Sequence, residues 1–133
     1  MIGIVIVAHG SLAGAYLEAV QHVVGPLPNA RAISISAEDG LNDRQAEICA
    51  AADEVDDGDG VVLVTDLFGS TPSNLAVSAC IADRMDVIYG ANIPVLIRLA
   101  KLRDQPRAVA VAGALEAGRR YMDVWQGPVA RAI

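Results

Sequence analysis

The stretch Ile2-Gly3-Ile4-Val5-Ile6-Val7-Ala8-His9-Gly10-Ser11 decides the fold class. Five of its first seven residues are β-branched, and only a glycine interrupts the apolar run before His9. A continuous apolar strand of this kind is buried on both faces, which is typical of a parallel sheet covered by helices. The sequence therefore predicts an α/β fold in which a central strand carries an imidazole to its carboxyl end.

The rest of the chain alternates predicted strands with predicted helices. A second continuous apolar strand covers residues 61–65, and shorter strands are expected at residues 31–36 and 85–89. A helix is expected after each strand, the second opening at Asn42 or Asp43, and two helices follow the last strand at 95–102 and 107–122. This pattern predicts a three-layer open sheet, mainly parallel, with strand order 2-1-3-4 and flanking helices.

We expect residues 1–133 to form one domain, because this length can bury a core without disulfides or metal. The tail at residues 124–133 contains glycine and proline. It is expected to be irregular or to form an extra C-terminal strand, which a dimer would exchange.

Charge and hydropathy exclude several classes of function. Sixteen Asp and Glu outnumber ten Lys and Arg, so the formal net charge is −6 and we expect neither nucleic acid nor an anionic membrane surface as a partner. The opening apolar run is too short for a signal peptide or a membrane span, so we expect a cytoplasmic protein without membrane insertion. Cys49 and Cys80 form no CxxC pair and are expected to be small buried thiols.

The most acidic stretch holds five carboxylates between Asp53 and Asp59. A calcium loop of the EF-hand type would need a glutamate at its twelfth position, but here the chain enters the apolar strand at Val61. The sequence therefore predicts a solvated turn before a strand.

Two polar residues follow the two long apolar strands, His9 after the first and Asp66 after the other. In strand order 2-1-3-4 these strands are neighbours about 5 Å apart, so the two side chains can touch. A carboxylate that binds one ring nitrogen fixes the tautomer and leaves the other nitrogen free as a nucleophile or ligand. The alternative interpretation is that His9 and Asp66 only cap the ends of their strands.

The run Gly69-Ser70-Thr71-Pro72 has the character of a helix start close behind Asp66. The exposed N–H groups and the dipole of such a start favour an anion, and phosphate is the natural candidate. Imidazole, carboxylate and anion cradle together suit a transient phosphohistidine, with no metal and no cofactor required.

Three blocks of sequence carry a family resemblance. They are residues 5–10 (Val-Ile-Val-Ala-His-Gly), 62–76 (Val-Leu-Val-Thr-Asp-Leu-Phe-Gly-Ser-Thr-Pro-Ser-Asn-Leu-Ala) and 90–94 (Gly-Ala-Asn-Ile-Pro). In order and spacing they resemble the mannose-type IIA component of the bacterial phosphoenolpyruvate-dependent sugar phosphotransferase system. The resemblance implies that His9 accepts a phosphoryl group from the phosphocarrier protein HPr and passes it to a IIB component for sugar uptake, with Asp66 orienting the ring. It also implies that the loop from Gly69 to Thr71 holds the phosphate and that the protein is a homodimer.

The loop departs from the family pattern, which reads aspartate, two residues and then Gly-Gly-Ser-Pro-Phe-Asn. Here Ser70 replaces the second glycine, Thr71 the serine and Ser73 the phenylalanine. Thr71 keeps a hydroxyl, so we expect the phosphate cradle to survive. Ser73 is expected to change a surface that partners touch.

Other functions remain open on the sequence alone. A phosphohistidine domain of this type could report phosphorylation state without transport, or serve dihydroxyacetone phosphorylation as a related domain does. The residues Val7 to Ser11 also resemble the start of small tetrapyrrole metal chelatases, but such a site needs converging ligands and His22 is the other histidine available.

Overall fold

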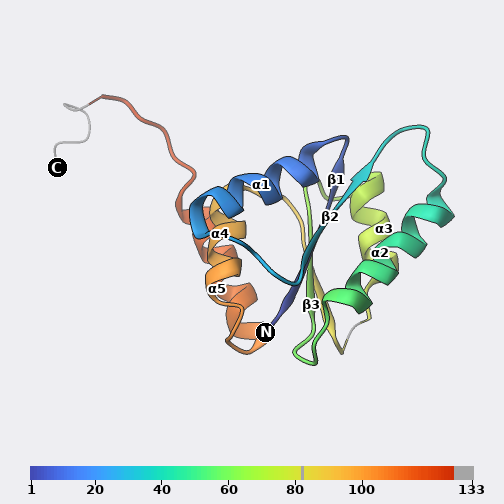
Figure 1. Ribbon diagram of the computed structural model, residues 1–133. Coiled ribbons are helices and arrows are strands. Elements are labelled where there is room, and N and C mark those ends of the chain that lie inside the picture. The colour runs from blue at the N-terminus through green and yellow to red at the C-terminus, as the bar shows by residue number, and fades with distance from the viewer. Residues whose placement is uncertain (82, 128–133) are drawn as a thin grey trace.

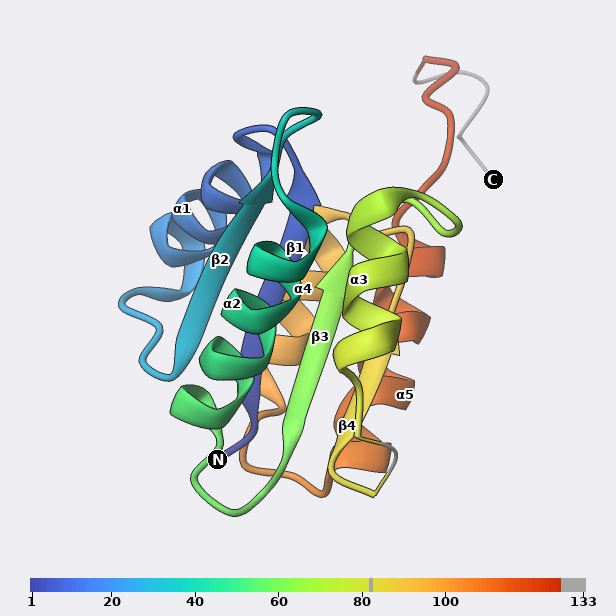
Figure 2. The same ribbon diagram turned by 90° about the vertical axis from the view of Figure 1, so that its right-hand side faces the viewer.

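The computed structural model describes residues 1–81 and 83–127. Over these residues the sheet has four parallel strands in the order β2-β1-β3-β4, and Figure 2 shows them side by side. The strands are β1 (Gly3–His9), β2 (Ala30–Ile35), β3 (Val61–Thr65) and β4 (Met85–Ile88). The predicted α/β class and strand order are therefore confirmed, with the fourth strand one residue shorter than expected.

Within the described residues, five helices cover the two faces of this sheet, and Figure 1 shows how they are arranged. They are α1 (Leu12–Val24), α2 (Leu41–Val55), α3 (Thr71–Ala79), α4 (Ile93–Lys101) and α5 (Arg107–Arg120). Helices α2 and α3 pack on one face, and α1, α4 and α5 pack on the other. Helix α2 begins at Leu41 behind Gly40, slightly earlier than predicted.

The strands β1 and β3 are buried on both faces because each face meets its own layer of helices. Alternate residues of β1 divide between two apolar clusters: Ile4 and Ile6 face α1, α4 and α5, whereas Val5 and Val7 face α2 and α3. At the start of β1 the chain passes so close to α2 that a Cβ on Gly3 would lie 2.4 Å from the carbonyl oxygen of Val55. This close approach explains the glycine inside an otherwise β-branched strand.

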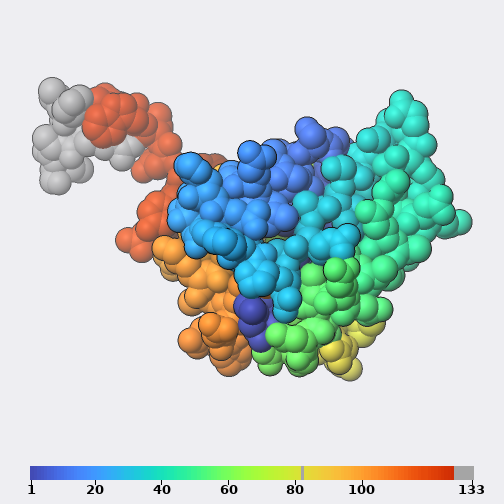
Figure 3. Space-filling model, in the orientation of Figure 1, coloured from blue at the N-terminus to red at the C-terminus, as the bar shows by residue number. Residues whose placement is uncertain are grey.

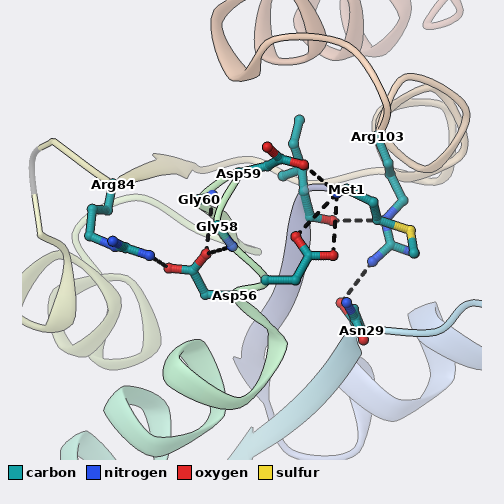
Figure 4. A network of polar contacts seen from close by, with 10 residues as sticks. Met1, Asn29, Asp56, Gly58, Asp59, Gly60, Arg84 and Arg103 are labelled. Atoms are coloured by element: carbon teal, nitrogen blue, oxygen red, sulfur yellow. Dashed lines mark hydrogen bonds and ion pairs between the residues drawn. The ribbon is translucent and has the colours of Figure 1, made fainter.

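The acidic stretch after α2 is the predicted turn, and it is ordered by hydrogen bonds (Figure 4). The Asp56 carboxylate accepts the backbone N–H groups of Gly58 at 2.9 Å and Gly60 at 3.2 Å, and it pairs with Arg84. The Arg84 guanidinium, followed by these N–H groups, lowers the pKa of Asp56. The Asp56 carboxylate in this turn therefore binds hydrogen-bond donors of the protein itself.

Arg103 holds together three segments of the chain near the amino ends of the strands (Figure 4). Its side chain is buried, its Nε donates to the Ile2 carbonyl at 2.8 Å, and its Nη2 donates to the Asn29 carbonyl at 2.8 Å. These contacts fix the α4–α5 connection to the start of β1 and to the loop before β2. Polar contacts thus connect the segments at the amino ends of the strands. The candidate site lies at the opposite end of the sheet, at the carboxyl ends of the strands.

Beyond α5 the chain leaves the body of the protein, and the described part of this tail stands away from it in Figure 3. Residues 122–127 form no strand. The exchanged C-terminal strand expected within residues 124–133 therefore falls mostly on residues 128–133, which lie outside the described residues.

The prediction of two buried thiols was wrong for Cys49, which is exposed, while Cys80 is half-buried. Cys49 lies one position after the buried Ile48, so it is on the outer side of α2. Within residues 1–81 and 83–127, no helix has the length and apolar character needed to span a membrane.

Candidate functional site

His9 and Asp66 meet at the carboxyl edge of the sheet, as the sequence predicts. His9 is the last residue of β1, and Asp66 follows the last residue of β3, its neighbouring strand. The ring nitrogen Nδ1 of His9 lies 2.7 Å from Oδ2 of Asp66, and the backbone N–H of His9 donates to the same oxygen at 3.0 Å. The side chain of His9 is 52% exposed, whereas that of Asp66 is 10% exposed. The structure thus buries the carboxylate and presents the imidazole.

This contact determines which ring nitrogen is available for chemistry. An ionised carboxylate can only accept hydrogen bonds, so the contact requires a proton on Nδ1 of His9, and in the neutral ring this leaves the lone pair of Nε2 free. Burial alone would raise the pKa of Asp66, but the hydrogen bonds from the His9 backbone and ring, together with the charge of that ring, outweigh burial and lower it. Asp66 is therefore ionised at neutral pH and able to stabilise positive charge on the ring.

The turn after Asp66 is held by three hydrogen bonds. Oδ1 of Asp66 accepts the backbone N–H of Leu67 at 3.0 Å. The carbonyl of Leu67 accepts the hydroxyl of Ser70 at 2.6 Å and the N–H of Ser70 at 3.3 Å. Gly69 between them has a φ of +83°, a left-handed conformation that favours glycine. The Ser70 hydroxyl thus fixes the turn that leads from Asp66 into α3.

Helix α3 begins directly at this turn. Ser70 is its N-cap residue, Thr71 is its first residue, and Pro72 follows in the first turn. The first turn has no acidic side chain, so no residue of that turn offsets the positive end of the helix dipole. Ser73 is only 1% exposed, so the expectation that it changes a surface touched by partners was wrong.

A cavity of about 240 Å³ opens between His9 and the starts of α2 and α3. Thr71, the first residue of α3, lines it, together with residues from the end of β2 to the start of α2. These residues are Ile35, Ser36, Ala37 and Leu41. The cavity is therefore lined by two hydroxyl-bearing residues, Ser36 and Thr71, together with the exposed His9.

Sequence reasoning missed Ser36 as a residue of this site. Its backbone is fixed by Asp39, whose carboxylate accepts the Ser36 N–H at 2.8 Å and whose own N–H donates to the Ser36 carbonyl at 3.1 Å. The signal was present, because the predicted strand at 31–36 ends at the same carboxyl edge as His9.

In the part of the chain that the structure describes, the chelatase interpretation finds no second histidine close to His9. His22 lies in the last turn of α1, ten residues after the start of that helix and so about 15 Å further along its axis. Among the residues that the structure describes, no group of three or more His, Cys, Asp or Glu side chains is placed to hold a metal ion.

A larger groove of about 590 Å³ lies away from His9, between β4 and the helices α4 and α5. Most of its wall is apolar and includes Ile88, Val95, Val111 and Leu115. Strand β4 is the edge of the described sheet on this side.

The chain matches the family model for the PTS system fructose IIA component over residues 3–115. It therefore belongs to the fructose and mannose type of IIA components of the sugar phosphotransferase system, and the predicted resemblance is confirmed. Proteins of this family are phosphotransfer components, which supports a transferase role.

Named relatives and solved structures agree with this assignment. The chain is 30% identical to the PTS system fructose-specific EIIA component of Bacillus subtilis over 105 residues, covering 78% of this chain and 72% of that protein. It is 31% identical to the PTS system sorbose-specific EIIA component of Lacticaseibacillus casei over 98 residues, covering 73% and 70%. The structure of a mannose/sorbose specific IIA subunit from Enterococcus faecalis superposes with a TM-score of 0.85 at 27% identity, covering 96% of both chains.

Proposed function

We propose that this protein is a phosphocarrier that accepts a phosphoryl group on His9 from phospho-HPr and passes it to a IIB component for sugar uptake. The observation that carries the proposal is the 2.7 Å contact between Nδ1 of His9 and Oδ2 of Asp66, which leaves Nε2 as the free nucleophile beside the cavity. Family membership supplies the chemical context. Both partners would meet the protein in the cytoplasm.

In the proposed step, the lone pair of His9 Nε2 attacks the phosphorus of the donor phosphohistidine. The new N–P bond forms as the N–P bond of the donor breaks in line, and the donor ring leaves with the electron pair. His9 keeps its proton on Nδ1, so its ring becomes cationic. The ionised Asp66 at 2.7 Å offsets this charge and thereby stabilises the phosphorylated state.

We propose that the loop from Gly69 to Thr71 and the start of α3 hold the transferred phosphoryl group. Gly69 and Thr71 would supply backbone N–H groups, and Thr71 would add its hydroxyl. Ser70 would act indirectly, because its hydroxyl and its N–H both donate to the Leu67 carbonyl. Ser36 lines the same cavity and would provide a second hydroxyl.

The direct test is incubation with phosphoenolpyruvate, enzyme I and HPr, followed by intact mass measurement. The expected result is a gain of one acid-labile phosphoryl group by the wild type and none by His9→Ala. His22→Ala serves as the matched control and should be labelled like the wild type. Labelling that persists in His9→Ala would contradict the assignment of the acceptor.

The second half of the proposal is transfer to a IIB component. The isolated phosphoprotein is mixed with IIB proteins of the mannose type, and loss of the phosphoryl mass from this chain is followed. Discharge to a IIB protein supports a role in uptake. Acceptance from HPr without discharge to any IIB protein would favour a regulatory phosphohistidine protein without transport.

We also propose that the protein is a homodimer joined at the groove beside β4. The groove is mostly apolar, and the tail that follows α5 carries Val124 and Trp125 with 57% and 70% of their surfaces exposed. A second copy that covers both features would bury this apolar surface. Light scattering should give twice the chain mass for the full protein and the monomer mass for a variant that ends at Arg120. A full-length monomer at micromolar concentration would contradict the proposal.

A further inference from the structure

The hydroxyl of Tyr16 is connected to the His9–Asp66 pair by a short series of hydrogen bonds. Tyr16 lies on α1, seven positions after His9, and its hydroxyl donates to the carbonyl of Ala91 at 3.1 Å. The N–H of Ala91 donates to the carbonyl of Thr65 at 3.0 Å. That carbonyl belongs to the peptide bond that leads into Asp66, so the series ends at the residue that holds the His9 ring.

Together these contacts connect several segments of the chain at the carboxyl ends of the strands. The connection from β4 to α4 carries Ala91, β3 carries Thr65, and β1 with α1 carries His9 and Tyr16. Each link crosses between segments that are far apart in the sequence, 75 residues for Tyr16 and Ala91 and 57 for His9 and Asp66. Displacement of the Ala91 turn would therefore release one constraint on the peptide before Asp66.

The surroundings of the Tyr16 side chain favour its hydrogen bond to the Ala91 carbonyl. It is half-buried, and its ring packs against the apolar cluster between the sheet and α1, α4 and α5. Burial, with the nearby negative charge of Asp66 as a further cause, raises the pKa of Tyr16. The hydroxyl thus stays protonated and remains a donor to the Ala91 carbonyl.

We propose that Tyr16 is a positioning residue for phosphoryl transfer: its hydroxyl holds the turn at Ala91 against the end of β3 and so keeps Asp66 aligned with the ring of His9. This inference rests on the proposed function of His9. It differs from the role of an ordinary core tyrosine, for which the ring alone matters. Phenylalanine keeps the ring and its packing but removes the donor, so Tyr16→Phe separates the two roles.

The first readout needs no phosphoryl donor. Ring nitrogen shifts of ¹⁵N-labelled histidine report the tautomer of His9, which in the wild type should be the form with the proton on Nδ1. In Tyr16→Phe we expect a mixture of the two tautomers at neutral pH, with far-UV circular dichroism unchanged. Tyr121→Phe is the matched control, because Tyr121 is 60% exposed beyond α5, and it should keep the wild-type shifts.

The second readout is the rate of phosphorylation by phospho-HPr. We expect Tyr16→Phe to slow it by about two- to tenfold, the size of one net hydrogen bond, while the final mass still shows one phosphoryl group. A Tyr16→Phe variant with wild-type tautomer and wild-type rate would overturn the positioning role. Absence of phosphorylation in the wild type would instead overturn the proposed function, and the tautomer measurement would still test the structural link.

Should Tyr16→Phe fail to fold, 3-fluorotyrosine keeps the ring and changes only the hydroxyl, which becomes more acidic and so alters the strength of its hydrogen bond to the Ala91 carbonyl. Replacement of all three tyrosines by 3-fluorotyrosine should then shift the His9 ring nitrogen signals, and it should do so equally in a Tyr89→Phe, Tyr121→Phe background, where Tyr16 is the remaining tyrosine. Unchanged His9 signals under this replacement would overturn the inference.

Discussion

One carboxylate oxygen of Asp66 binds His9 twice. Its Oδ2 accepts the backbone N–H of His9 at 3.0 Å and the ring Nδ1 at 2.7 Å. Both donors belong to His9. The acceptor that they share therefore limits the rotation of the imidazole about its side-chain bonds. The pair also lies just beyond the last paired positions of β1 and β3, Val7 and Thr65. The direction of Nε2 is therefore set by strand pairing and does not depend on a mobile loop.

Asp66→Asn should slow phosphorylation while the fold is kept. The asparagine amide fills the same space, but either its NH2 group faces the two His9 donors and disfavours the proton on Nδ1, or its oxygen accepts them more weakly than a carboxylate does. It also removes the negative charge opposite the phosphorylated ring. We expect the rate to fall by about 10²-fold or more, the scale typical of a positioned acid or base.

The check is the time course of phosphoryl incorporation measured by intact mass. Asp53→Asn is the matched control, since Asp53 is exposed on α2 near the amino edge of the sheet. The same rate in Asp66→Asn and in the wild type would remove the orienting role from Asp66.

The lowered pKa of Asp66 predicts how stability responds to acid. Burial opposes the ionised form, but the His9 donors and the His9 charge lower the pKa of the folded carboxyl below that of an unfolded aspartate, about 3.9. The ionised Asp66 therefore stabilises the folded state above this pH, and the contribution is lost as pH falls through the folded value. The difference in unfolding free energy between wild type and Asp66→Asn should shrink as pH falls below about 5. Urea unfolding at a series of pH values measures it, and a constant difference throughout would disprove the linkage.

Substitution of glycine by alanine should have opposite effects on the free energy of unfolding at two positions of the chain. A Cβ on Gly3 would lie 2.4 Å from the Val55 carbonyl oxygen, whereas a Cβ on Gly14 would meet nothing within 4 Å. Gly3→Ala should lower the free energy of unfolding by about 1–3 kcal/mol, because backbone cannot move aside easily. Gly14→Ala should raise it by about 0.5–1 kcal/mol, because alanine is the better residue inside a helix. Urea unfolding gives both values, and equal effects at the two sites would refute the packing argument.

Most of the fold could be predicted because its strands differ in hydrophobic pattern. The strands β1 and β3 are continuous apolar runs and lie in the centre, whereas β2 alternates and lies at the edge of the sheet. The contact of His9 with Asp66 then followed from two neighbouring strands that end at the same edge. Periodicity thus determined both the layers and the central pair of the site.

The remaining features depend on contacts that periodicity does not encode. The Ser36 wall of the cavity depends on how Asp39 folds the β2–α2 connection, and the Tyr16 hydroxyl finds its acceptor 75 residues away. The hydroxyl of Ser70 looked like a phosphate ligand, but it donates to Leu67, three residues back along the chain. Such side-chain to backbone contacts compete with other partners of the same group, so they are decided only in the folded chain.

The hydroxyls of the residues that line the cavity beside His9 give the last prediction. Ser36 and Thr71 line the same space as the imidazole. If both hydroxyls bind the phosphoryl group, Ser36→Ala and Thr71→Val should each slow transfer by about tenfold or more, since a hydrogen bond to a charged group is worth about 1.5–3 kcal/mol. Thr71→Val keeps the shape of the side chain, so its loss isolates the hydroxyl.

Ser34→Ala is the matched control, because Ser34 is an exposed residue of β2 only two positions before Ser36 but does not line the cavity. Rates are measured with phospho-HPr at concentrations below and above saturation, so that docking and transfer are separated. A loss only in Thr71→Val would assign the phosphoryl group to α3 alone and remove Ser36 from the site. A loss in Ser36→Ala that Ser34→Ala shares would attribute the effect to the strand and not to the hydroxyl.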